Sequence, residues 1–415
     1  MTLSLVNAAV AALSLFSACT VPTAAPGGKK NVVYYTNWSI YDRQFNPQDL
    51  PSNKITHVLH SFANVQADGT VFLSDPWADI QKQFSTDTAE TGTNVYGIMK
   101  QLYLLKKSNR KLKVQLSIGG ASFSANFPTA ASTVANRERF AKSAVKLVAD
   151  LGLDGLDIDW EFPTTKAEGD NYVSLLKAVR VELDAYSKKS ASCYRFLLTI
   201  AASAGPATYA IQPLAALAKT VDWFNLMAYD YSGSWSGTAA HQANLYKSND
   251  TLVTPFSTKA AVDAYLATGV AAKQIVLGMP IYGRAFSNTA GLGKPFSGQP
   301  AGTWGEAGVY DYKVLPRPGA LEFTDAASGA TYSYDATKKE LVTYDTPEMV
   351  RAKVVWAKNK QLGGSMFWEA SADKTGDKSL IAKSAGEWGN AALDGSVNQL
   401  EYPESVYANL KAGMV

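Results

Sequence analysis

Residues 154–161, Asp-Gly-Leu-Asp-Ile-Asp-Trp-Glu, hold the side chains best suited to do chemistry. Side chains on a β-strand alternate between its two faces, so Asp157, Asp159 and Glu161 are expected to share one face. Carboxyl groups spaced in this way lie roughly 6–7 Å apart and repel one another, which raises the pKa of at least one of them. A carboxyl group that keeps its proton near neutral pH can act as a general acid. We therefore predict acid catalysis at this strand.

Two other interpretations would explain these acidic residues without catalysis. A solvated edge strand often carries acids on its wet face, but Leu156, Ile158 and Trp160 make the opposite face too apolar for an edge. A calcium-type site also uses carboxylate oxygens, but an EF-hand loop needs glycine where Phe162 stands. No histidine flanks the stretch, which argues against zinc and non-haem iron. We therefore predict no metal and no other cofactor.

The elements that must position these acids alternate along the chain from Asn31 onward. Short β-branched or aromatic runs predict strands at residues 32–36, 57–63, 114–118, 155–159, 196–201, 223–227, 275–279 and 364–368. Longer patterns between them predict helices, for example at 96–108, 136–150, 171–186 and 258–268. Eight strands that alternate with helices predict an α/β fold, the (β/α)8 TIM barrel.

A doubly wound open sheet is the alternative to a barrel. It is disfavoured because no glycine-rich nucleotide turn follows the first expected strand. In a barrel of this kind the functional residues gather at the carboxyl ends of the strands. Glu161 directly follows the fourth expected strand, so we expect its side chain at the open mouth of the barrel.

The chain is expected to divide into one barrel with additions. The stretch between the seventh and eighth strands is too long for one helix and predicts a small α+β insertion at about residues 286–350, which leaves 31–285 and 351–400 for the barrel. The apolar start predicts a signal peptide over residues 1–22, and therefore secretion. Residues 23–30, which end in Lys29-Lys30, are a candidate propeptide. Cleavage at residue 22 would remove Cys19 and leave Cys193 as a lone, buried thiol.

Composition excludes several classes of protein. The chain has 415 residues, of which 47% are hydrophobic and 18% charged, as expected for a globular protein. The net charge of +3 is too small to indicate a nucleic-acid-binding protein. No segment after the N-terminal apolar run is long and apolar enough to span a membrane. The aromatic content of 11% suits a protein that stacks flat side chains against sugar rings, although a large aromatic core would account for it equally.

The acidic stretch resembles a known signature. Its pattern, Asp-x-x-Asp-x-Asp-x-Glu from Asp154 to Glu161, looks like the catalytic motif of glycoside hydrolase family 18 chitinases. Ser-Ile-Gly-Gly at 117–120, Met-Ala-Tyr-Asp-Tyr at 227–231 and Gly-Ser-Met-Phe-Trp-Glu-Ala at 364–370 also match the family, around the third, sixth and eighth strands. The resemblance to the secreted fungal type of these enzymes spans nearly the whole chain from Asn31.

This resemblance implies roles for individual residues. Glu161 would protonate the leaving glycosidic oxygen, and Asp159 would hold the N-acetyl group of the substrate. Asp157 would tune the charge of Asp159, and Tyr229 would bond the N-acetyl carbonyl. The residues expected to bind substrate are Tyr34, Phe62, Ser117, Gly120, Met227, Asp230, Tyr282, Arg284 and Trp368.

The expected activity is therefore secreted chitinase. A family 18 enzyme of this type would cut the β-1,4 links of chitin and chitooligosaccharides with retention of configuration, because the acetamide of the substrate is itself the nucleophile. The alternatives are an endo-β-N-acetylglucosaminidase acting on N-glycan cores and a chitin-binding lectin on the same fold. We expect a monomer that binds neither nucleic acid nor membrane. Where the family commonly has Trp after the Gly-Gly pair this chain has Ala121, so the platform for the leaving-side sugar is expected to be weaker or to be supplied by Phe123.

Overall fold

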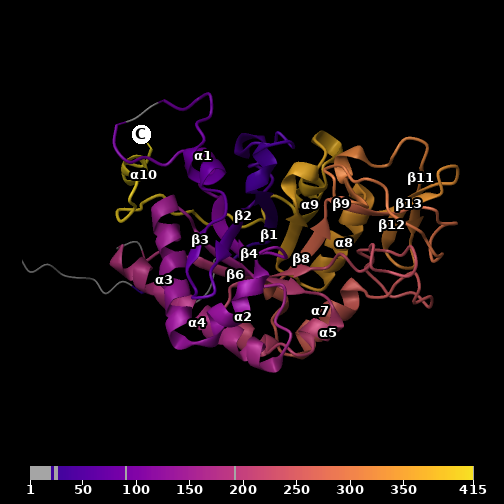
Figure 1. The fold of residues 1–415 in the computed structure, drawn as a ribbon, viewed down its shortest axis with the longest axis horizontal. Coiled ribbons are helices and arrows are strands. Elements are labelled where there is room, and N and C mark those ends of the chain that lie inside the picture. The colour runs from indigo at the N-terminus through magenta and orange to yellow at the C-terminus, as the bar shows by residue number, and fades with distance from the viewer. Residues whose placement is uncertain (1–19, 23–26, 89–90, 191–192, 415) are drawn as a thin grey trace, which may run out of the picture.

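The computed structural model describes residues 20–22, 27–88, 91–190 and 193–414. Most of the expected signal peptide, residues 1–22, and half of the candidate propeptide lie outside these ranges. Across the described residues the chain forms a barrel with a smaller sheet beside it (Figure 1).

Eight parallel strands close the barrel and confirm the predicted fold class. Their order is β1-β14-β8-β7-β6-β5-β4-β2, and pairing of β1 with β2 joins the two ends. The strands are β1 (Lys30–Thr36), β2 (His57–Val65), β4 (Lys113–Gly119), β5 (Gly155–Asp159), β6 (Leu197–Ser203), β7 (Trp223–Met227), β8 (Ile275–Pro280) and β14 (Gly364–Trp368). A short strand, β3 (Val71–Leu73), pairs antiparallel with the end of β2. Each predicted strand overlaps one of the eight.

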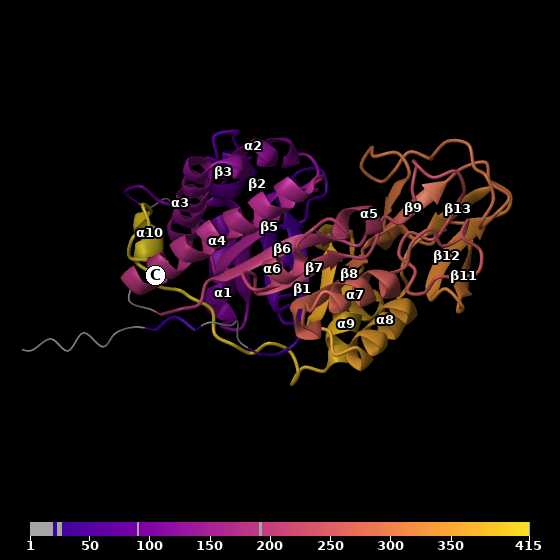
Figure 2. The same ribbon diagram turned by 90° about the horizontal axis from the view of Figure 1, so that it is seen from below.

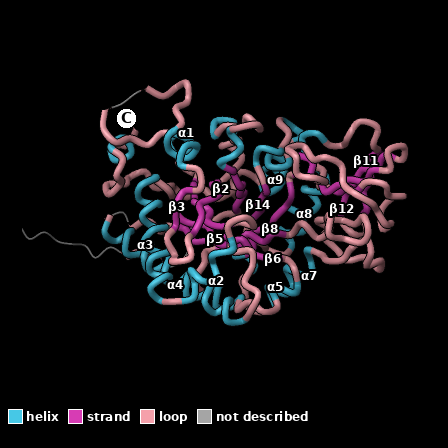
Figure 3. Tube along the Cα trace, viewed as in Figure 1, coloured by secondary structure: helices cyan, strands magenta, loops and turns pink. Residues whose placement is uncertain are grey.

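Helices connect the strands around the outside of the barrel (Figures 2 and 3). They are α1 (Gly97–Ser108), α2 (Phe127–Ser132), α3 (Val134–Leu151), α4 (Lys166–Lys189), α5 (Pro206–Tyr209), α6 (Leu214–Ala218), α7 (Thr258–Ala267), α8 (Pro347–Asn359), α9 (Leu380–Trp388) and α10 (Ala408–Lys411). Hydroxyl groups start several of them: Thr133 accepts from the third helical N–H of α3, and Thr165 does the same for α4. Pro347 at the first position favours the start of α8 in the same way.

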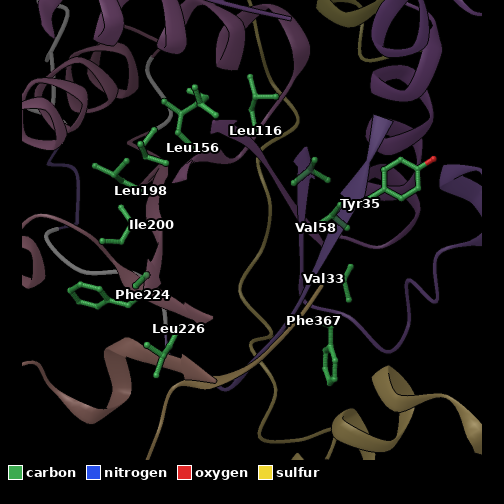
Figure 4. Packing of buried hydrophobic residues seen from close by; sticks show 14 of the residues in the cluster. Val33, Tyr35, Val58, Leu116, Leu156, Leu198, Ile200, Phe224, Leu226 and Phe367 are labelled. Carbon is green, nitrogen blue, oxygen red and sulfur yellow. The ribbon is translucent and has the colours of Figure 1, made fainter. Parts of the chain in front are cut away.

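The main hydrophobic core lies between the barrel and this helical layer (Figure 4). Leu156 and Ile158 of β5 are fully buried there, together with helix residues such as Val148 and Leu176. The residue between them, Asp157, bonds to side chains from other strands inside the barrel. The alternation expected from the sequence is therefore present: the apolar face of β5 meets the helices, and the acidic face looks inward.

A five-stranded antiparallel sheet follows β8 and occupies the orange region of Figure 1. Its order is β10-β9-β13-β12-β11. The strands are β9 (Tyr282–Phe286), β10 (Val309–Asp311), β11 (Leu321–Asp325), β12 (Ala330–Asp335) and β13 (Glu340–Thr343). The expected insertion started at residue 286, which is too late, because β9 pairs with β10 and β13 and belongs to this sheet. The expected end at 350 falls inside α8.

Both chain ends differ from the expected domain boundaries. Lys30 is the first residue of β1 and pairs with Gly364, and the Lys29 N–H donates to Ala392 O at 2.7 Å. The candidate propeptide therefore includes a residue of the barrel. At the other end the barrel was expected to stop at residue 400, but Tyr402 and Leu410 are buried. Figure 2 shows this yellow C-terminal segment running from α9 to α10 along the barrel.

The expectation of a lone thiol at Cys193 is wrong. Cys193 is disulfide-bonded. Cys19, which lies outside the described residues, is the other cysteine of the sequence.

Candidate active site

Asp157 lies fully buried at the centre of the barrel and is held by four donors. Tyr34 and Ser117 donate hydroxyl bonds to its Oδ2 at 2.9 and 2.8 Å. Thr199 and Asn225 donate to its Oδ1 at 2.6 and 3.0 Å. Burial raises the pKa of Asp157 and the hydrogen bonds oppose that rise. Thr199 and Asn225 were not among the predicted site residues.

Asp159 stands two residues further along β5, next to the mouth of the barrel. Its side chain is buried, and its Oδ1 has no hydrogen-bond partner among the described residues. Burial raises the pKa of Asp159 well above its usual value, and the negative charges of Glu161 and Asp157 raise it further. A buried carboxyl oxygen without a partner is costly, so a site of this kind is expected to receive a hydrogen bond from a ligand.

Glu161 lies just beyond the carboxyl end of β5. The preceding Trp160 is buried and stacks on Phe127 with ring centroids 5.5 Å apart, which fixes the backbone before Glu161. Burial, followed by the negative charge of Asp230, raises the pKa of Glu161 to about 7, while a hydrogen bond from the Ala121 N–H opposes the rise. The side chain therefore keeps its proton in mildly acidic solution, as a general acid must.

A cleft of about 860 Å³ opens above these acids at the carboxyl ends of the strands. The predicted site residues that line it are Tyr34, Phe62, Asp159, Glu161, Met227, Tyr229, Asp230, Tyr282, Arg284 and Trp368. The other three lie behind the lining. Asp157 and Ser117 are buried beneath it, and Gly120 packs so closely on Phe62 that a Cβ there would come within 2.6 Å of the ring.

Aromatic rings form one wall of the cleft. Trp368 lies 5.2 Å from Tyr34 and 5.6 Å from Phe62, and its plane is within 20° of that of Phe62. Trp38 extends this wall toward solvent, 6.2 Å from Phe62 and 38% exposed. Trp38 was not among the predicted site residues, although it lies only two residues beyond the end of β1. Flat apolar rings beside polar groups suit a sugar ring, which has apolar faces and polar edges.

A charged cluster forms the opposite side. Arg284 holds Asp230 with two hydrogen bonds of 2.9 Å, and Tyr282 donates to the same carboxylate at 2.7 Å. Tyr229 packs edge-on against Tyr282, with centroids 6.2 Å apart. Burial and the charge of Asp159 raise the pKa of Tyr229 well above its usual value, so its hydroxyl keeps its proton and can donate a hydrogen bond.

Within the described ranges, no group of three or more His, Cys, Asp or Glu side chains is placed to hold a metal ion. The polar groups that line the site include carboxyl, phenol and guanidinium groups. The cleft has aromatic walls and holds a protonated glutamate beside a buried carboxyl group. Glycoside hydrolases use this combination of groups.

Comparison with known proteins agrees with this class. The family model for glycosyl hydrolases family 18 matches residues 30–373, and the chain belongs to this family. Endochitinase 1 of Metarhizium robertsii is 51% identical over 417 residues, which cover 98% of each chain. The resemblance proposed from the motifs is thereby confirmed.

Two solved structures share the fold along most of the chain. The catalytic domain of psychrophilic chitinase B from Arthrobacter TAD20 is 29% identical with a TM-score of 0.81, and the match covers 91% of this chain and 100% of that one. A class V chitinase from Nicotiana tobaccum, a glutamate-to-glutamine mutant in complex with NAG4, is 26% identical with a TM-score of 0.75. That match covers 87% of this chain and 99% of the other.

Proposed function

We propose that this protein is a chitinase, which hydrolyses β-1,4 linkages between N-acetylglucosamine units. The observation that carries the proposal is the pair of neighbouring acids, in which the partly buried Glu161 has its pKa raised to about 7 and the buried Asp159 keeps an unbonded oxygen. The likeness to an endochitinase of 51% identity supports the substrate class. The tobacco structure in complex with NAG4 supports binding of chitooligosaccharides in a cleft of this kind.

The proposed first step uses Glu161, Asp159 and Tyr229. Glu161 gives its proton to the leaving glycosidic oxygen while the acetamide oxygen of the substrate attacks the anomeric carbon. The bond to the leaving sugar breaks and a cyclic oxazolinium ion forms. Asp159 in its ionised form, which the developing positive charge favours, accepts the amide N–H at its free oxygen and balances that charge, and Tyr229 donates to the acetamide oxygen. A preorganised carboxyl group in a dry site stabilises such a charge far more than water does.

The second step returns the site to its starting state. Glu161, now ionised, takes a proton from water as the water oxygen attacks the anomeric carbon and opens the ring. Two displacements on one carbon retain the β configuration. Asp157 keeps a fixed position throughout because its oxygens accept bonds from four neighbouring side chains.

Product analysis tests this proposal. Chitin oligomers, a glycoprotein with N-glycans and buffer alone are incubated with the protein, and released reducing ends are measured with the anomers resolved at first turnover. A chitinase releases β-anomers from chitin oligomers. Release from the glycoprotein alone indicates an endo-β-N-acetylglucosaminidase, and release from neither indicates a lectin. An α-anomer as first product contradicts the substrate-assisted mechanism.

We also propose that the protein is a secreted monomer. None of the helices within the described ranges could span a bilayer. The apolar segment at residues 1–22 supports secretion. Mass spectrometry of the protein from the culture medium determines the mature start, and loss of the apolar segment at residues 1–22 is the expected result.

The small side chain of Ala121 leads to a prediction about the part of the cleft that binds the leaving sugar. Ala121 is exposed and lines the cleft, and Phe123 is only partly buried nearby. Ala121→Trp adds an indole face worth about 1 kcal/mol of stacking, so we expect tighter binding of the leaving-side sugar and more transglycosylation. The ratio of longer to shorter products from chitotetraose measures this. Product profiles identical to those of the parent reject the idea that this position limits binding.

A further inference from the structure

Ser124 lies at the start of a short helical turn after β4 and touches the backbone of the acid-bearing segment. Its side chain is buried, with 7% of the residue exposed. Its Oγ accepts a hydrogen bond from the Glu161 N–H at 2.8 Å. The same oxygen lies 3.0 Å from Gly120 O and 3.3 Å from Asp159 O, and its hydroxyl can donate to either carbonyl. One hydroxyl therefore joins the ends of β4 and β5.

The backbone around this hydroxyl is tightly fitted. The Gly120 N–H donates to Asp159 O at 2.8 Å. Gly119 has a φ of +115°, and a Cβ on it would come within 2.1 Å of Asp159 O. The two strand ends thus approach more closely than side chains would permit, and the Ser124 hydroxyl fills the remaining polar position between them.

The same loop also influences the carboxyl group of Glu161. The Ala121 N–H favours its ionised form and so lowers its pKa. Residues 121–124 thus hold the backbone of Glu161 through Ser124 and favour the ionised carboxyl group through Ala121.

We propose that Ser124 is a positioning residue for hydrolysis, which holds Glu161 where its proton can reach the glycosidic oxygen. The inference rests on the proposed function of Glu161 as the acid. Ser124 is not among the residues that line the cleft, so it acts through the backbone that it holds, that of Glu161 above all. Its loss should therefore slow the chemical step and leave substrate binding nearly unchanged.

Two variants separate the hydrogen bond from the space that it occupies. Ser124→Ala removes the hydroxyl, and Ser124→Cys keeps a similar volume but offers only a weak acceptor. For both variants we expect kcat on chitotetraose to fall about 10- to 100-fold, because a displacement of the catalytic acid by about 1 Å can lower the rate about 10²-fold. KM should stay within about twofold of the parent value. Ser124→Thr retains a hydroxyl and should restore much of the rate.

The pH profile supplies a readout that a purely structural role would not move. Loosening of Glu161 from the Ala121 N–H removes a bond that lowers its pKa, so the alkaline limb of kcat should shift to higher pH in the Ala and Cys variants. Ser132→Ala is the matched control, because Ser132 is exposed and its hydroxyl donates to Thr129 O in α2, away from the cleft. It should leave kcat and the profile unchanged.

The outcomes are distinct. An unchanged kcat in both variants overturns the inference. So does a lower kcat with an unchanged pH profile, and so does a higher KM with an unchanged kcat. These results require an active parent. A parent with no hydrolytic activity instead refutes the proposed function itself.

Discussion

Glu161→Gln is expected to reduce kcat on chitin oligomers by about 10²- to 10⁴-fold, the range that general acid catalysis contributes. Glutamine has nearly the same shape but no proton to give to the glycosidic oxygen and no carboxylate to activate water. The aromatic wall and the Asp230–Arg284 pair remain, so the dissociation constant for chitotetraose should change less than about threefold. Steady-state kinetics and isothermal titration calorimetry measure the two quantities.

The pH dependence of the parent provides a second test of the same group. Because the pKa of Glu161 is raised to about 7, the acid is protonated below that pH and loses its proton as the pH rises through it. The alkaline limb of kcat should therefore fall about tenfold per pH unit above that value. Glu138→Gln, an exposed glutamate on α3, is the matched control and should keep the parent profile. Near-normal turnover by Glu161→Gln contradicts the assignment of the acid.

Asp159→Asn is expected to lower kcat about 10²- to 10³-fold, comparable to the loss of a group that stabilises transition-state charge. The amide cannot balance the oxazolinium charge. Its NH₂ also repels the acetamide N–H if it takes the place of the free oxygen. The effect should be largest on substrates in which the acetamide of the reacting sugar attacks its own anomeric carbon.

The control for this substitution is Asp170→Asn on α4. Asp170 is exposed and pairs with Lys166 at 2.7 Å, so the same chemical change there should leave kcat unaltered. Thermal unfolding of both variants is compared with that of the parent. An Asp159→Asn enzyme that folds normally and turns over within threefold of the parent contradicts the role given to this carboxyl group.

Sequence alone was sufficient where short-range geometry controls the outcome. The period of two along β5 placed Leu156 and Ile158 toward the helices and Asp157 toward the barrel axis, because strand side chains must alternate. The eight strands followed from alternating patterns that a closed parallel sheet requires. Glu161 at a strand end placed the acid at the mouth of the barrel.

Tertiary structure decided what depends on contacts between distant segments. Thr199 and Asn225 hold Asp157 from other strands, and no local pattern distinguishes them from ordinary strand residues. The same holds for Ser124, whose hydroxyl meets the Glu161 N–H only because β4 and β5 are neighbours. The pKa of Glu161 depends on burial and on Asp230, which approaches across the cleft.

The boundaries of the elements differ for the same reason. Nothing within the sequence of β9 shows that it pairs with β10 and β13 instead of continuing the barrel. Lys30 likewise owes its surroundings to a distant part of the chain, since it pairs with Gly364. The sequence by itself thus determined the fold and the chemical identity of the acids, since both follow from local periodicity and residue type. Only folding determined which side chains hold those acids, since hydrogen bonds and electric fields act through space.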